Sequence, residues 1–81
     1  MKISLTAHAA IRARERLPGV RLSRICGQLK QRIRTELRLG AEVNWAGCLE
    51  IEIRPGILAV CAPSLAGGYD VVTFIVREEP D

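Results

Sequence analysis

The sequence predicts an α+β domain in which two N-terminal helices pack on one face of an antiparallel sheet of about four strands. Up to Gly40 the apolar residues recur at helical spacing, whereas beyond it apolar and polar residues alternate as in a half-buried strand. Helices followed by a run of strands are typical of the α+β class. With 81 residues the chain is expected to form a single small domain, 1–81.

The first predicted helix, Thr6–Leu17, follows the segment Lys2–Leu5, which is either a short strand or an extended lead-in. Thr6 is a suitable cap, because its hydroxyl can accept a free backbone N–H of the first helical turn. Pro18 and Gly19 then end the helix.

The second predicted helix begins at the cap Ser23 and runs to about Leu39, with Gly40 as the glycine that follows a helix end. Its expected core stripe consists of apolar residues at helical spacing, namely Leu22, Ile25 or Cys26, Leu29, Ile33 and Leu37.

The second half of the chain is predicted to form a meander of short strands. Glu42–Ala46 and Cys48–Arg54 are the first two, and the Pro55-Gly56 pair after them is typical of a tight turn. Largely apolar strands are expected at Ile57–Ala62 and Tyr69–Val76. Arg77–Asp81 is expected to be an acidic tail.

Charge is distributed unevenly along the chain. Nine basic and two acidic residues lie between Arg12 and Arg38, a balance of +7, whereas the chain from Gly40 onward has a balance of −5. A basic half that consists mainly of arginine is typical of a nucleic-acid surface, and a solvated helix face is the alternative. We therefore expect a nucleic acid as a partner, and no metal site because the sequence contains no cluster of metal ligands.

Cysteine and apolar content set limits on the class of protein. Cys26, Cys48 and Cys61 are widely spaced and accompany a single histidine, which argues against a disulfide scaffold and a structural zinc site. No apolar run approaches the roughly 18 residues of a membrane span. We expect a cytoplasmic protein without a cofactor.

One motif combines groups suited to phosphodiester chemistry. His8, Arg12 and Arg16 recur every four residues, so they drift by only about 80° around a helix. An imidazole can transfer a proton near neutral pH, and guanidinium groups bind phosphate in a bidentate way. These three are the candidate catalytic residues. The alternative is that His8 is a histidine satisfied by hydrogen bonds near the first helical turn and that the two arginines are ordinary surface side chains.

This motif, followed by a second helix, a meander and the closing strand segment Val71–Ile75, resembles the RelE-like domains. It is similar to the BrnT-type toxins and to a bacterial and phage domain family that opens with a His-Ala-x-x-Arg-x-x-x-Arg helix. In that family glycine directly follows the second arginine, whereas Leu17 and Pro18 intervene here. The resemblance implies a toxin-like ribonuclease that needs no metal, acts on free or ribosome-associated RNA and is paired with an acidic antitoxin.

For such a ribonuclease, the ribose 2′-OH attacks the adjacent phosphorus while His8 transfers a proton and Arg12 and Arg16 hold the phosphate. Glu15 and Tyr69 are candidates for the second proton-transfer group, and Tyr69 is alternatively a residue that stacks on a base. The other expected RNA-binding residues are basic side chains of the two helices, namely Arg14, Arg24, Arg32, Arg34 and Arg38.

Two other functions are consistent with the sequence. The first is a non-catalytic module of the same fold that binds nucleic acid or an acidic protein through its arginines. The second is a small phage structural or assembly protein, for which the short apolar strands predict self-association, in the simplest case as a homodimer.

Overall fold

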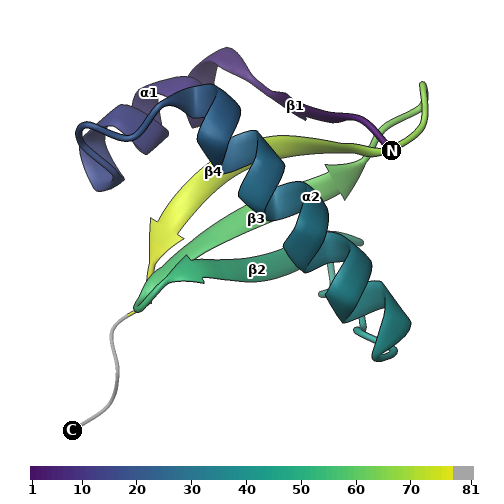
Figure 1. The fold of residues 1–81 in the computed structure, drawn as a ribbon. Helices are drawn as coiled ribbons and strands as arrows, with labels where there is room; N and C mark the ends of the chain where they lie inside the picture. Colours follow the sequence, from purple (N-terminus) through teal and green to yellow (C-terminus); the bar gives the residue numbers. More distant parts are fainter. Residues whose placement is uncertain (78–81) are drawn as a thin grey trace, which may run out of the picture.

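The computed structural model describes residues 1–77, and the expected tail beyond Arg77 lies outside them. Two helices cover one face of a four-stranded sheet whose strand order is β1-β4-β3-β2 (Figure 1). The prediction of an α+β fold with two N-terminal helices and four strands is confirmed. The elements are β1 (Ile3–Leu5), α1 (Ala7–Arg16), α2 (Leu22–Arg38), β2 (Leu49–Arg54), β3 (Ile57–Pro63) and β4 (Tyr69–Val76).

The sheet is mixed, so the prediction of an antiparallel sheet is wrong in one respect. Strands β2, β3 and β4 form an antiparallel meander, whereas β1 runs parallel to β4 and pairs Ile3 with Tyr69 and Leu5 with Val71. The chain places both helices and two strands between these partners. Their relative direction is therefore set by packing over the whole chain, and no local pattern encodes it.

Helix α1 begins as the sequence predicts. The Thr6 hydroxyl accepts a hydrogen bond from the Ala9 amide at 3.1 Å and donates one to the Val72 carbonyl at 3.2 Å. On the side of α1 that faces the sheet, Ala9 and Ala13 are fully buried, and the helix packs mainly on β4. The small side chains let the helix approach the strand closely.

The buried side of helix α2 agrees with the predicted core stripe at its centre, but the C-terminal end of the stripe and the N-terminal cap differ from the prediction. Ile25, Leu29 and Ile33 are fully buried, but Leu37 is 46% exposed because the helix extends beyond the sheet there (Figure 1). The cap is Arg21 and not Ser23, and no side chain caps this end. Gly40 follows the helix with a φ of 80°, as expected of a glycine after a helix end.

The predicted strand Glu42–Ala46 is wrong, because this segment forms a turn built around Asn44. The Asn44 side-chain oxygen accepts hydrogen bonds from the amides of Ala46 and Cys48, and its nitrogen donates to Glu50 at 2.8 Å. An asparagine that binds its neighbours' backbone in this way competes with strand pairing. Trp45, at the tip of the turn, is 98% exposed.

The remaining strands follow the alternation in the sequence. Leu49 and Ile51 of β2 are buried beneath the helices, whereas Glu50 and Glu52 point to the opposite, exposed side. The Pro55-Gly56 pair makes the tight turn into β3, with Gly56 at a φ of 79°. This turn brings the end of β2, including Arg54, to the same end of the sheet as the beginning of β3.

Candidate functional site

The packing of α1 determines which of its side chains face solvent. Because Ala9 and Ala13 are turned toward β4, His8 and Arg16 are exposed and Arg12 is partly exposed. At 100° per residue, these three and Glu15 fall within an arc of roughly 100°. The structure therefore brings the candidate catalytic residues together with Glu15 on one solvent-facing side of α1, which we call the α1 face.

An ion pair links two residues of the α1 face. Arg12 donates from Nη1 to the Glu15 carboxylate at 2.8 Å, and the two side chains are 40% and 49% exposed. At such exposure the pair contributes at most about 1 kcal/mol to stability. Its main effect is chemical, because it places a carboxylate beside the arginine while Arg16 has no carboxylate partner among residues 1–77.

Tyr69, the other candidate for the second proton-transfer group, is placed elsewhere. It is the first residue of β4 and pairs with Ile3 of β1. Its side chain is half-buried and packs against the hydrophobic core. Of the two candidates, Glu15 is the one that shares the α1 face with His8.

The other predicted RNA-binding arginines do not gather on a single face. Arg14 projects from α1, while Arg24 and Arg32 lie on the flank of α2 that faces β2, where each lines a cavity. Arg34 lies about 160° around the helix from Arg32 and is exposed. Arg38 is exposed in the last turn of α2.

Two adjoining cavities share Arg54, at the end of β2, as a lining residue. One lies between α2 and β2, and the other lies between Arg54 and the segment that connects α1 to the start of α2. One has a volume of about 200 Å³ and is lined by Gln28, Gln31, Arg32, Glu52, Ile53 and Arg54. The other has a volume of about 330 Å³ and is lined by Gly19, Val20, Arg21, Arg24 and Arg54. We call the second one the arginine cavity.

Sequence reasoning missed Arg21 and Arg54 as candidate site residues. Arg54 lies in the acidic half of the chain, at the end of a strand, and nothing near it in the sequence indicates a site. Its side chain is held in place by two hydrogen bonds from Nη1, to the Gln28 Oε1 at 3.0 Å and to the Ile53 carbonyl at 2.7 Å. Gln28 is 26 residues away in the chain, so only the fold brings the two together.

Two of the three cysteines offer little nucleophilic chemistry. Burial raises the pKa of the Cys61 thiol to about 12, with a further increase from the nearby Cys48, and burial also raises the pKa of Cys26. Both thiols therefore stay protonated at neutral pH. Within the described chain, no group of three or more His, Cys, Asp or Glu side chains is arranged to hold a metal ion.

No helix within residues 1–77 has the length and apolar character needed to cross a membrane. In comparisons with known proteins, no family model, no curated protein and no solved structure matches this chain.

Proposed function

We propose that this protein is an RNA-acting domain of the RelE-like type that cleaves phosphodiester bonds at the α1 face without a metal ion. The observation that carries the proposal is the shared exposure of His8, Arg12, Glu15 and Arg16 on one side of α1. The side chains on this face offer two proton-transfer groups and two phosphate-binding groups. RNA supplies the remaining group, because its ribose 2′-OH is an internal nucleophile.

The cleavage proceeds as an internal displacement. The 2′-oxygen loses its proton to the Glu15 carboxylate and forms a bond to phosphorus, while the bond from phosphorus to the 5′-oxygen breaks. His8 donates a proton to the departing 5′-oxygen. The products are a 2′,3′-cyclic phosphate and a 5′-hydroxyl, and Arg16 together with Arg12 stabilises the charge that develops on the phosphate oxygens.

Cleavage of a fluorescently labelled single-stranded RNA in the presence of EDTA tests this proposal. His8→Ala is expected to lower the rate by at least about 100-fold, the typical contribution of a positioned acid or base. Ile11→Ala is the matched control, since Ile11 is 55% exposed on the same helix and belongs to none of the candidate groups. An RNA with a single 2′-deoxyribose at the cleaved position should resist cleavage there.

Several results would contradict the proposed ribonuclease activity. These are an unchanged rate in His8→Ala, cleavage of the 2′-deoxy substrate, or products without a cyclic phosphate. Failure of the wild-type protein to cleave both free and ribosome-bound RNA would also contradict the proposal.

The second candidate is a non-catalytic module that binds nucleic acid, and the position of the cavities favours it. Both cavities are lined by arginines, and neither is lined by His8. For this function His8→Ala leaves RNA binding unchanged, and the logarithm of the affinity falls linearly with the logarithm of salt concentration. If the partner is a protein, an acidic antitoxin is the candidate, because its carboxylates would complement the arginines that line these cavities.

We also propose a cytoplasmic location, which the three free cysteines support. Cys26, Cys48 and Cys61 form no disulfide, as is usual for proteins of a reducing compartment.

A further inference from the structure

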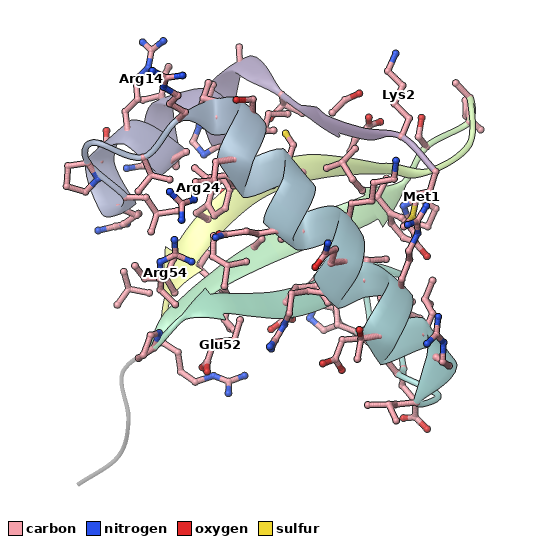
Figure 2. All side chains as sticks on the ribbon, in the orientation of Figure 1. Met1, Lys2, Arg14, Arg24, Glu52 and Arg54 are labelled. Carbon is pink, nitrogen blue, oxygen red and sulfur yellow. The ribbon has the colours of Figure 1, made fainter. Side chains whose placement is uncertain are left out.

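The arginine cavity combines an unusual set of lining residues. Three of the five lining residues within the described chain, Arg21, Arg24 and Arg54, carry guanidinium groups, and no acidic residue among 1–77 lines the cavity. Arg24 comes from the first turn of α2 and Arg54 from the end of β2, and Figure 2 shows their side chains turned toward the same space. The fold therefore concentrates positive charge from separate segments at one place.

This concentration of charge is unfavourable unless an anion offsets it. Like charges that lie close together repel one another. Arg21 and Arg24 are exposed, so water and salt screen part of this repulsion, whereas Arg54 is partly buried. Among residues 1–77, none of the three guanidinium groups forms an ion pair with a carboxylate. Glu52 of β2 lines the adjoining cavity and not this one.

Arg54 is oriented so that it keeps a binding edge free. Both of the hydrogen bonds that it donates within residues 1–77, to Gln28 and to the Ile53 carbonyl, leave from Nη1. A guanidinium has five N–H donors, of which Nη1 carries two. The N–H groups of Nη2 and Nε are left for a ligand, and these are the donors that bind two phosphate oxygens at once. Because Gln28 already fixes the side chain, binding costs less conformational entropy.

The size and surroundings of the cavity suit a phosphate group. A water molecule occupies about 30 Å³ in the liquid, so a cavity of about 330 Å³ holds a phosphate with several waters. The beginning of α2 borders it, and no side chain caps that helix end. Its free backbone N–H groups add to the positive potential that the arginines establish.

We propose that the arginine cavity is a binding site for a phosphate group, which Arg21, Arg24 and Arg54 contact directly. The site is distinct from the α1 face and does not depend on RNA cleavage there. The ligand is either a phosphate of an RNA backbone or a free phosphate, since both present the same oxygens to the guanidinium groups.

The test is a titration of the ¹⁵N-labelled protein with inorganic phosphate at constant ionic strength, with chloride as the reference anion. The arginine Nε–H resonances report on each side chain. We expect saturable shifts at Arg21, Arg24 and Arg54 and none of comparable size at Arg77. Shifts that are unsaturable, or that spread evenly over all arginines, would overturn the proposal.

Variants of equal charge sharpen the test. Arg54→Gln should weaken phosphate binding about tenfold or more, as expected for loss of charge-assisted hydrogen bonds. Lys2→Gln removes the same charge from an exposed position on the opposite side of the molecule (Figure 2) and should change the affinity less than twofold. Arg24→Gln, at an exposed helical position, gives a second variant in case Arg54→Gln unfolds. If all three variants bound phosphate with the same affinity, the arginine cavity would not be a specific phosphate-binding site.

A competition experiment then identifies the source of the phosphate. If a single-stranded oligouridylate with a 5′-hydroxyl displaces inorganic phosphate from the three arginines, the ligand is the RNA backbone. If the oligonucleotide leaves phosphate bound, the site serves a free phosphate. Both results support the site itself, and both can be obtained whether or not the protein cleaves RNA.

Discussion

The hydroxyl of Thr6 donates a hydrogen bond to the backbone carbonyl of Val72, 66 residues later in the chain. The same oxygen accepts the Ala9 amide, so one side chain both caps α1 and fastens it to β4. The backbone adds a parallel contact, from the Thr6 amide to the Val71 carbonyl at 3.0 Å. The position of the α1 face relative to the sheet therefore depends on this residue.

Thr6→Ala is expected to lower the free energy of unfolding by about 1 kcal/mol, within the range of about 0.5–2 kcal/mol known for lost helix caps. Thr6→Ser keeps the hydroxyl and should retain most of the stability. Urea unfolding followed by circular dichroism measures both. Equal losses in the two variants would mean that the methyl group, and not the hydroxyl, is what matters.

Ala13→Leu is expected to destabilise the protein by about 1–3 kcal/mol, because the added atoms have no space between α1 and β4. Ala7→Leu is the matched control, since Ala7 is exposed at the start of the same helix. Thermal unfolding of the two variants should separate them clearly. A stable Ala13→Leu protein would show that α1 can shift on the sheet.

Gly67 and Gly68 provide a matched pair in the loop before β4. Both have positive φ angles, 91° and 75°, which cost about 1–2 kcal/mol for alanine. A Cβ at Gly68 would also collide with the Lys2 backbone, whereas at Gly67 it meets nothing. Gly68→Ala should therefore be the more destabilising in urea. It should also disturb the pairing of β1, because the Lys2 carbonyl just before that strand accepts a hydrogen bond from the Tyr69 amide. Equal effects would mean that backbone conformation alone sets the cost.

The raised pKa of Cys61 predicts a loss of stability in alkali. The unfolded thiol ionises near its ordinary pKa of 9.0, whereas the folded one ionises at about 12. The unfolded state thus binds fewer protons between these values, so this contribution to stability is complete below pH 9 and is lost as the pH rises toward 12. Cys61→Ala should flatten that part of the profile, measured as urea midpoints against pH. A slope that is unchanged in Cys61→Ala would assign the effect to other groups.

Much of the local structure follows from short-range patterns. The caps Thr6 and Gly40, the buried stripe through Leu29 and the turn at Pro55 all lie within a few residues of the atoms they organise, so the sequence alone predicts them. The predicted strand at Glu42–Ala46 is wrong, because the Asn44 side chain takes the backbone hydrogen bonds that a strand would need.

The α1 face could be predicted from spacing, because a regular helix fixes the relation between His8, Arg12 and Arg16 whatever the rest of the chain does. Spacing does not reveal the arginine cavity. That cavity depends on Arg54 meeting α2, and on the hydrogen bond to Gln28 that fixes it there.

The sequence by itself determined the identity and order of most elements and the grouping of residues on the exposed side of α1, because helical and strand periodicity are local properties of the chain. Only the tertiary structure decided that β1 runs parallel to β4, that the arginines of α2 separate onto different flanks, and that Arg21, Arg24 and Arg54 converge. These relations join residues that are distant in sequence, and the packing of the whole core sets them.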